Sequence, residues 1–585
     1  MKILLVAVNA SYMHTNLAVR YLKTFAQKYL SDEKKLQTQI NIAEFTINQP
    51  FIETLRGIKS FEPELVLFST YIWNSTYISN IISDVKKILP FCIIGAGGPE
   101  FSYSAQKYLT ALPSLDFVIN GEGENTFLEF IEAFSNSAEI LQNLNEESEK
   151  ILKIKGISFV KNTKFIFTGF RDLLQNLDEL PFAYPEILEG NFESDHKIYY
   201  YESNRGCPFS CSYCLSSVES SVRFKSLQKV KEEIQIFLDA NIKLVKFVDR
   251  TFNLNSERYI EIWHYILEHH NGKTMFHFEI EAEYLSREAL DFLQKVPKNI
   301  MQFEIGIQSA NKKTLASIDR STNIEKTAEN ILRIPKSIHS HVDLIAGLPY
   351  EDLESFGKSY DFAMNLCPDA LQLGFLKILP GTKMESFAKK NGWQWMENPV
   401  YETFSSPYIN FNQMMYLKDI EITTDFLWNK HILDNFANYV FRKLGAWNFI
   451  RVLTDFGREK KAFLQARKDS FWYELIFDFI KEKCACEKNL FSKVNILLLE
   501  DLLRYDFVLS GKKGNFPSWY RHFYSKENHL KLLEEKGLLH NNRLAFANSE
   551  YEEFSFDVQN EFPEENEKKC NLLILYKESG KNCNF

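Results

Sequence analysis

The stretch Asn204-Arg205-Gly206-Cys207-Pro208-Phe209-Ser210-Cys211-Ser212-Tyr213-Cys214 directly follows a short run of strand-forming residues. Its cysteines are spaced C-x3-C-x2-C, and the glycine and proline around the first cysteine favour a tightly curled loop. Iron-sulfur clusters are normally held by four cysteine thiolates, and no fourth cysteine lies close by. We therefore expect Cys207, Cys211 and Cys214 to bind a [4Fe-4S] cluster with one iron left free. The alternatives are a zinc site completed by a distant histidine, or three incidental thiols.

The motif begins a repeat of strand and helix patterns over residues 196–390. Six apolar or alternating runs are expected to be strands, with helical periodicity between them: Ile198–Glu202, Leu244–Asp249, Met275–Glu281, Met301–Ile307, Val342–Ala346 and Leu371–Ile378. Six strand-helix units in about 190 residues fit a partial (β/α)6 barrel better than a complete eight-unit barrel of about 250 residues. The chemistry of such barrels lies at the carboxyl ends of the strands.

Residues 1–150 show a second alternation, in which the strand candidates are continuous apolar runs: Ile3–Val8, Ile40–Phe45, Leu65–Ser69, Cys92–Gly95 and Phe117–Ile119. Such runs indicate a parallel sheet covered on both faces, so a doubly wound, flavodoxin-like domain is expected. Ligands of these sheets lie beyond the carboxyl ends of the strands. Glycines and small polar residues cluster there, either to bind a ligand or only to form tight turns.

Two further parts complete the chain. Residues 151–195 are expected to be a linker with a hairpin, Ile157–Val160 and Phe165–Phe167, followed by a proline that stops regular structure. Residues 391–585 are expected to be a mostly helical domain rich in aromatic residues. Aromatic residues at helical spacing are usually core, and less often a surface on which RNA bases stack.

The bulk properties of the 585 residues limit the partners. A net charge of −9 gives no general basic surface, so nucleic acid is an unlikely partner. No apolar run is long enough for a membrane helix, and no secretory leader is evident, which predicts a cytoplasmic protein. The nine cysteines do not form a disulfide pattern.

Later segments of the barrel carry a resemblance to a known family. The cysteine spacing, with Tyr213 before the last cysteine, resembles the radical S-adenosylmethionine (SAM) superfamily. Four segments agree with it in order and position: FVDRTFN (247–253), EIGIQS (304–309), DLIAGLP (343–349) and LPGT (379–382). With the N-terminal part, they resemble the class in which a cobalamin (B12)-binding domain precedes the barrel. The remainder resembles an uncharacterised domain attached to one branch of that class.

The resemblance implies the cofactors and their contacts. The free iron would bind S-adenosylmethionine, and electron transfer would cleave it to a 5'-deoxyadenosyl radical. An electron donor such as flavodoxin or ferredoxin is the implied partner. Each implied contact could instead be an ordinary polar residue at a strand end. Tyr213 would line the adenine pocket, Glu304, Gln308 and Ser309 would bind the ribose or methionine end, and Asp249 and Asn253 would contact the methionyl amine.

The same resemblance gives the N-terminal domain a cobalamin site, although the D-x-H-x-x-G motif that supplies a histidine to cobalt in many B12 proteins is missing. Three functions are compatible with the sequence. The first is a cobalamin-dependent radical enzyme that modifies an unknown substrate, with methyl transfer as one form of that chemistry. The second is a radical enzyme whose N-terminal domain no longer binds B12, and the third is a metal-stapled protein that binds RNA or protein. The nucleotide tail of cobalamin would lie along Ser69, Thr70, Gly97, Gly98, Gly121 and Gly123.

Overall fold

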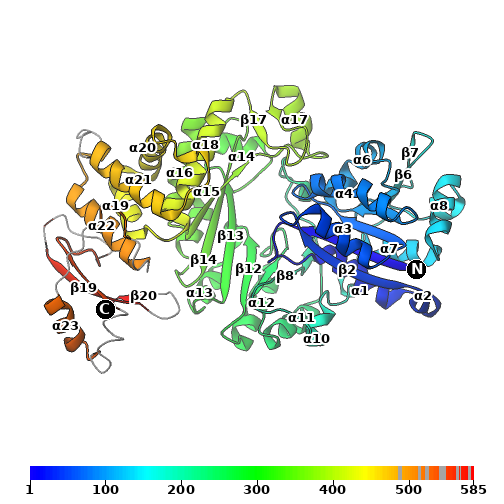
Figure 1. The fold of residues 1–585 in the computed structure, drawn as a ribbon, viewed down its shortest axis with the longest axis horizontal. Coiled ribbons are helices and arrows are strands. Elements are labelled where there is room, and N and C mark those ends of the chain that lie inside the picture. Colours follow the sequence, from blue (N-terminus) through cyan, green and yellow to red (C-terminus); the bar gives the residue numbers. More distant parts are fainter. Residues whose placement is uncertain are drawn as a thin grey trace.

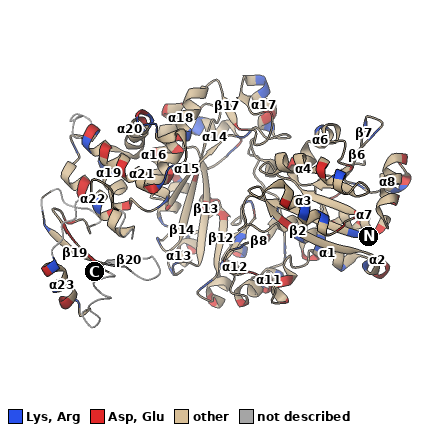
Figure 2. Cartoon of the chain, viewed as in Figure 1, with Lys and Arg blue, Asp and Glu red and all other residues tan. Residues whose placement is uncertain are grey.

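A computed structural model describes residues 1–484, 491–510, 516–520, 526–538, 549–560, 566, 568–576 and 582–584. Three parts follow one another along the long axis in chain order: an α/β domain, a sheet of six strands flanked by helices, and a mostly helical part (Figure 1). Basic and acidic residues both occur on helices of all three parts (Figure 2). No helix among the described residues is both long and apolar enough to cross a membrane.

The N-terminal domain has a seven-stranded sheet of order β2-β1-β3-β4-β5-β6-β7. The first five strands in this order are parallel, which confirms the flavodoxin-like arrangement. The hairpin β6-β7, predicted to lie in a linker, instead extends this sheet, because β6 pairs antiparallel with β5. The strands are β1 (Lys2–Asn9), β2 (Gln39–Thr46), β3 (Leu65–Ser69), β4 (Ile93–Gly97), β5 (Phe117–Ile119), β6 (Ile157–Lys161) and β7 (Lys164–Phe167).

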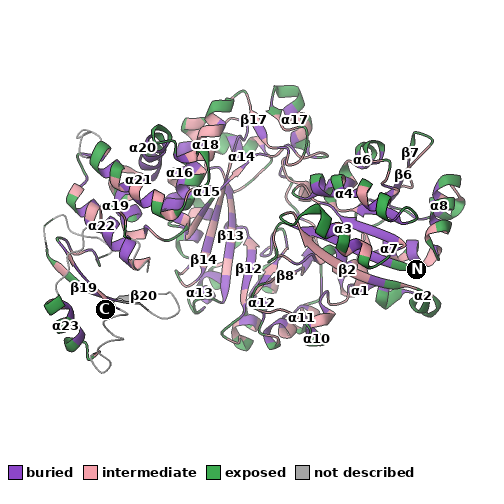
Figure 3. Ribbon diagram, viewed as in Figure 1, coloured by how far each residue is buried: buried purple, intermediate pink, exposed green. Residues whose placement is uncertain are grey.

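Helices cover both faces of this sheet, and β1 shows why. Its odd-numbered residues, such as Leu5, belong to one apolar core, and its even-numbered residues, such as Val6, belong to another. Side chains alternate between the two faces of a strand, so a continuous apolar run is buried on both sides. The inner strands β1 and β3 are accordingly buried, whereas the edge strand β2 is mostly intermediate (Figure 3). The main helices are α1 (Leu17–Tyr29) and α7 (Glu124–Ala133) on one face, and α3 (Phe51–Ser60), α4 (Ser75–Ile88) and α6 (Ala105–Ala111) on the other.

The central part is a sheet of six parallel strands in the order β15-β14-β13-β12-β11-β8. Every predicted barrel strand is present, which confirms the partial (β/α)6 barrel. The strands are β8 (Ile198–Tyr201), β11 (Leu244–Phe247), β12 (Met275–Ile280), β13 (Met301–Gln308), β14 (His339–Ala346) and β15 (Ala370–Phe375). The helices between them include α11 (Leu227–Asp239), α12 (Ser256–His269), α13 (Arg287–Leu293), α14 (Lys312–Ser317), α15 (Ile324–Leu332) and α16 (Leu353–Met364).

The two faces of the barrel sheet differ in chemistry. On β13, Phe303, Ile305 and Ile307 are buried in the core under the helices, while Gln302 and Glu304 alternate with them on the inner face. Neighbours in register on parallel strands point to the same face. The inner face is therefore polar, where a complete barrel holds layers of valine, isoleucine and leucine. Its side chains include Lys246, His277, Glu279, Gln302, Glu304, His339, His341 and Asp343.

The C-terminal part packs its helices on the barrel and shares the barrel's apolar core. Trp428, Trp447 and Trp472 are buried, which agrees with their prediction as core residues. A three-stranded antiparallel sheet was not predicted, because acidic residues interrupt its alternation of apolar residues. The elements are α18 (Phe411–Thr424), α19 (Asp434–Leu444), α20 (Ala446–Glu459), α21 (Asp469–Phe479), α22 (Ile496–Leu509), α23 (Lys526–Glu535), β18 (Ser549–Phe554), β19 (Cys570–Tyr576) and β20 (Asn582–Asn584).

Candidate functional site

The cysteine motif lies in a loop whose two ends form a short antiparallel pair, β9 (Asn204–Arg205) and β10 (Arg223–Phe224). Gly206, at the start of the loop, has a φ of +91°, and a Cβ there would lie 1.9 Å from the carbonyl oxygen of Ser221. The two sides of the loop therefore touch through backbone atoms, and only glycine fits at this position. The backbone N–H of Cys207 also reaches across the loop and donates to Glu219 O at 3.4 Å.

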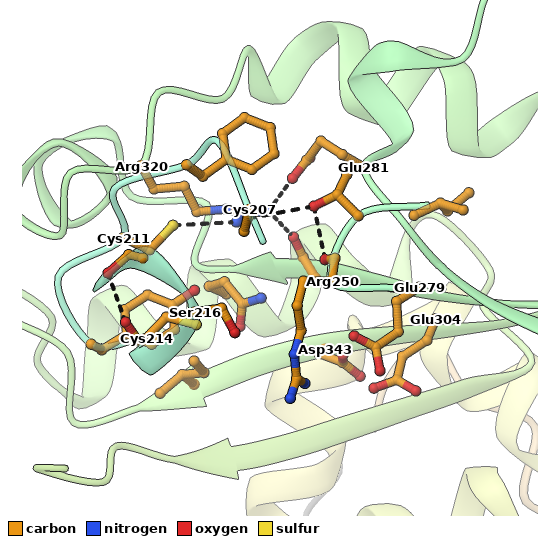
Figure 4. A pocket seen from close by; sticks show the side chains of 18 residues that line it. Cys207, Cys211, Cys214, Ser216, Arg250, Glu279, Glu281, Glu304, Arg320 and Asp343 are labelled. Atoms are coloured by element: carbon orange, nitrogen blue, oxygen red, sulfur yellow. Dashed lines mark hydrogen bonds and ion pairs between the residues drawn. The ribbon is translucent and has the colours of Figure 1, made fainter. Parts of the chain in front are cut away.

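The three cysteines line one cavity of about 310 Å³ at the carboxyl ends of the barrel strands (Figure 4). Cys207 and Cys211 are buried, and Cys214 is half-buried. Burial raises the pKa of the Cys211 thiol, and the guanidinium of Arg320 opposes this rise. Arg320 Nη1 donates to Cys211 Sγ at 3.9 Å. A cation beside a thiol favours the thiolate, which is the form that binds metal, so this donor set fits an iron-sulfur cluster.

Arg320 is held in place by the strand ends around it. Its Nη2 donates to Glu281 Oε2 and to Gly306 O, both at 2.5 Å. Burial raises the pKa of Glu281, and the charge of Arg320 acts in the opposite direction. Sequence reasoning missed both residues, because Arg320 lies in a loop after α14 and belongs to none of the motifs.

Carboxylates gather beside the cysteines: Glu279, Glu304 and Asp343 line the cavity next to Arg250 (Figure 4). Burial alone would raise the pKa of Glu304. Hydrogen bonds from His277 Nε2 at 3.0 Å and Lys246 Nζ at 2.9 Å lower that pKa to about 2 instead. Glu304 is thus ionised and can only accept hydrogen bonds.

Asp343, unlike Glu304, has a raised pKa. Burial, together with the nearby charges of Glu304 and Glu279, raises its pKa to about 8. Its Oδ1 is buried and has no hydrogen-bond partner among the described residues. A buried polar atom of this kind calls for a partner, so the cavity wall is incomplete without a polar ligand.

The cavity brings together some of the residues predicted from the family resemblance. Tyr213, Glu304 and Gln308 line it with the three cysteines. A β-bulge between Gly306 and Gln308 redirects the glutamine, whose φ is +67°. A Cβ on Gly306 would lie 2.1 Å from the Gln308 amide nitrogen, so the missing side chain makes room for that amide.

Three other predicted residues make their contacts within the fold, outside the cavity wall. Asp249 is fully buried and accepts hydrogen bonds from the backbone N–H groups of Ser203 (2.7 Å) and Asn204 (3.1 Å), which fixes the approach to β9. Asn253 exchanges two hydrogen bonds of 2.9 Å with the backbone of Glu281. Ser309 Oγ donates to Glu351 Oε1 at 2.6 Å.

The residues predicted for cobalamin lie at the carboxyl ends of three neighbouring strands. Ser69 ends β3 and Thr70 follows it, Gly97 ends β4 and Gly98 follows it, and Gly121 and Gly123 lie in the loop after β5. Gly98 has a φ of +101°, and a Cβ there would lie 2.4 Å from Thr70 O. Gly121 has a φ of +74°, and a Cβ there would meet nothing within 4 Å. The backbone at Gly121 thus faces open space, which fits a ligand that approaches the main chain closely, whereas Gly98 allows the turns after β3 and β4 to pack against each other.

These strand ends also face the barrel. In the loop after β1, His14 Nδ1 lies 2.7 Å from the hydroxyl of Tyr200 on β8. In the helix after β4, Glu100 accepts a hydrogen bond from Oη of Tyr401, which lies just after the barrel and whose backbone carbonyl accepts from the N–H of Ile378 after β15. After β5, Glu124 Oε1 accepts from Arg205 Nη2 at 2.5 Å. The carboxyl edge of the first sheet therefore abuts the end of the barrel that carries the cysteines.

Family models match all three parts of the chain. The Radical SAM superfamily model matches residues 201–363, the B12 binding domain matches residues 3–131, and a protein of unknown function, DUF4080, matches residues 389–576.

Two of the similar proteins are methyltransferases by name. The chain is 27% identical over 359 residues to the uncharacterized methyltransferase PH0819 of Pyrococcus horikoshii, a match that covers 58% of this chain and 72% of that protein. It is 24% identical over 374 residues to the cobalamin-dependent radical SAM methyltransferase TokK of Streptomyces tokunonensis, covering 61% of this chain and 52% of that protein. The chain thus matches only about half of TokK.

Solved structures share the fold. The cobalamin-dependent SAM radical enzyme OxsB with aqua-cobalamin bound gives a TM-score of 0.60 at 15% identity, and the match covers 93% of this chain and 81% of that one. The radical SAM methyltransferase TsrM of Kitasatospora setae gives 0.53 at 15% identity, covering 68% and 80%. The cofactors of this chain are accordingly a [4Fe-4S] cluster, S-adenosylmethionine and cobalamin. The chain belongs to the radical SAM superfamily, as an enzyme with an N-terminal B12-binding domain and a C-terminal domain of unknown function.

Proposed function

We propose that this enzyme transfers a methyl group from S-adenosylmethionine, by way of cobalamin, to an unreactive carbon atom of a polar substrate. The radical chemistry lies within residues 196–390, and cobalamin binds within residues 1–150. One observation carries the proposal: the glycine turns of the first sheet and the cysteine cavity of the second lie at edges that touch each other. Two cofactors bound at these edges would be close enough to act on one substrate.

Each part of the cavity has a role in this proposal. Cys207, Cys211 and Cys214 would hold the cluster, which would supply the electron that cleaves S-adenosylmethionine. Tyr213 would lie against the adenine, and Glu304, kept ionised by its hydrogen bonds from Lys246 and His277, would accept hydrogen bonds from ribose hydroxyls. Asp249, Asn253 and Ser309 do not line the cavity. They support the segments around it through hydrogen bonds with Ser203, Glu281 and Glu351, respectively.

The overall reaction balances with two molecules of S-adenosylmethionine and two electrons from the reductant. One molecule gives methionine and 5'-deoxyadenosine, which carries the hydrogen atom removed from the substrate. The other gives its methyl group to the substrate carbon and leaves as S-adenosylhomocysteine. The similarity to PH0819 and TokK, both named as methyltransferases, supports methyl transfer among radical reactions.

The polar inner face of the barrel supports a polar substrate. His339 Nε2 lies 2.7 Å from His341 Nε2, and Gln302 Nε2 lies 3.2 Å from the same nitrogen. His339 is partly exposed, with 39% of its side chain accessible. These groups continue the line of Asp343 and Glu304 down the sheet, and they can hydrogen-bond a substrate that extends from the cavity along this face.

Anaerobic reconstitution with iron, sulfide and hydroxocobalamin tests the proposal. With reductant and S-adenosylmethionine, the protein should form 5'-deoxyadenosine and S-adenosylhomocysteine, both of which can arise without the substrate. Cys214→Ala should abolish 5'-deoxyadenosine, while Cys367→Ala, an exposed cysteine far from the cavity, should not. Deoxyadenosine without S-adenosylhomocysteine would indicate radical chemistry without methyl transfer. If neither product formed, the proposal would be refuted, and a metal-stapled binding protein would be favoured.

A further inference from the structure

We propose that Glu122, in the segment Gly121–Glu124 of the B12-binding domain, is a positioning residue that closes the neck of the cysteine loop. Through this segment, binding of cobalamin alters the cysteine loop and hence the environment of the cluster that it holds. The second statement rests on the function proposed above. The first concerns only the cysteine loop and stands without cobalamin.

The neck of the loop places two cations against each other. Arg205 on β9 and Arg223 on β10 are register partners in the antiparallel pair that joins the two ends of the loop. Like charges directly opposite each other on paired strands are destabilising. An anion that contacts both arginines therefore stabilises the pair that joins the two ends of the cysteine loop.

Glu122 supplies that anion from the other domain. Arg223 donates to its two carboxylate oxygens at 2.8 and 3.1 Å, and Arg205 Nη1 lies 3.4 Å from Oε1. Other acids contact one of the arginines only: Glu124 and Glu202 pair with Arg205, and Glu219 pairs with Arg223. Among the described residues, Glu122 is the only acid that forms an ion pair with both arginines.

The contact between Glu122 and the two arginines is shielded from solvent, so its charges interact strongly. The exposed fraction of the side chain is 6% for Arg223, 12% for Arg205 and 19% for Glu122. Burial raises the pKa of Glu122, but the hydrogen bond from Arg223 and the charge of Arg205 outweigh it, and the net pKa is lowered. Neutralising Glu122 would leave Arg205 paired with Glu124 and Glu202 and Arg223 paired with Glu219, so what is lost is the shielded ion pair that bridges the two strands of the neck.

The segment that carries Glu122 also carries the predicted cobalamin contacts. Gly121 and Gly123 flank the glutamate, and Gly121 faces open space at a φ of +74°. Its N–H donates to Ser102 Oγ at 2.9 Å, and Glu122 Oε2 accepts from Leu174 N at 3.0 Å. A ligand that contacts the backbone at Gly121 acts on the peptide next to Glu122. The predicted cobalamin turn and the carboxylate that pairs with both arginines of the neck thus lie in one segment of four residues, Gly121–Glu124.

Glu122→Gln tests both statements, because it keeps the shape and removes the charge. Glu129→Gln is the matched control: Glu129 lies on α7 of the same domain and pairs with Arg171, away from the barrel. The first readout is iron retention against a chelator. We expect at least a tenfold faster loss of iron from Glu122→Gln than from the wild type or the control, and partial rescue in Glu122→Asp. Equal iron retention in Glu122→Gln and the control would overturn the role of Glu122 at the neck.

The second readout is the electron paramagnetic resonance spectrum of the reduced cluster, recorded with and without hydroxocobalamin before any turnover. We expect hydroxocobalamin to change the spectrum in the wild type and in Glu129→Gln, and to change it less in Glu122→Gln and more again in Glu122→Asp. Binding of hydroxocobalamin without any spectral change in the wild type would overturn the communication. Failure of the wild type to bind hydroxocobalamin would overturn both the communication and the cobalamin part of the proposed function, while iron retention would still decide the role at the neck.

Discussion

Replacing Gly206 by alanine tests whether the cysteine loop depends on its close backbone contact. At a φ of +91° an L-residue is strained by about 1–2 kcal/mol. The added Cβ would also lie 1.9 Å from Ser221 O, whereas ordinary contacts begin near 3.4 Å, so one side of the loop must retreat by more than an ångström. Ser221 lies two residues before Arg223, so the shift would disturb the β9-β10 pair. We expect a total cost of about 3–5 kcal/mol.

The matched control is Gly169→Ala, because Gly169 has a φ of +95° and a Cβ there meets nothing within 4 Å. The control carries the same backbone strain without the clash. A difference of about 3 kcal/mol corresponds to roughly a hundredfold weaker hold on the cluster. Iron and sulfide analysis after anaerobic reconstitution, followed by competition with an iron chelator, measures this difference. If the two variants retained iron equally well, the inferred role of the backbone contact would be refuted.

Three further predictions concern the cavity and the cobalamin turns. Burial raises the pKa of Asp343 to about 8, against 3.8 in an unfolded chain. Between about pH 4 and 8 the folded protein therefore keeps a proton that the unfolded chain releases. The free energy of unfolding should decline as the pH rises through that window. The thermal midpoint of the wild type should fall more from pH 5 to pH 8 than that of Asp343→Asn, and parallel curves would contradict this. Arg320→Gln removes a charged donor from Cys211, so iron retention at pH 7 should fall by about tenfold or more. Retention should recover in part at higher pH, where the thiol ionises without help. An unchanged pH profile would exclude a role of Arg320 in stabilising the thiolate. Gly98→Ala places a Cβ 2.4 Å from Thr70 O, and should weaken hydroxocobalamin binding at least tenfold while leaving the iron content unchanged; loss of both would point to misfolding instead.

Local periodicity was sufficient to predict most of the strands in the two large sheets. The continuous apolar run of β1 and the alternation of β13 are properties of short segments, and these strands extend at most one residue beyond the predicted runs. The sheet to which a strand belongs is a tertiary property. The hairpin β6-β7 was therefore predicted as a hairpin, but its pairing with β5 was not.

The candidate site divides in the same way. The cysteines and Tyr213 lie within one motif, so their proximity could be predicted from spacing. Arg320 contacts Glu281 across 39 residues of chain, and no local pattern reports that contact. Asp249 shows the converse case. A polar residue at the end of a strand can face a ligand or its own backbone, and its hydrogen bonds to Ser203 and Asn204 become visible only in three dimensions.

On β13 and β14, the apolar side stabilises the fold, whereas the polar side is available to bind a ligand. The free energy that keeps the sheet folded comes from residues such as Ile305 and Leu344, which lie under the helices. The residues between them, such as Gln302 and His341, contribute little apolar burial. They can be exchanged for other polar groups at small cost in stability. A strand built in this way can be adapted to a new substrate without redesign of its core.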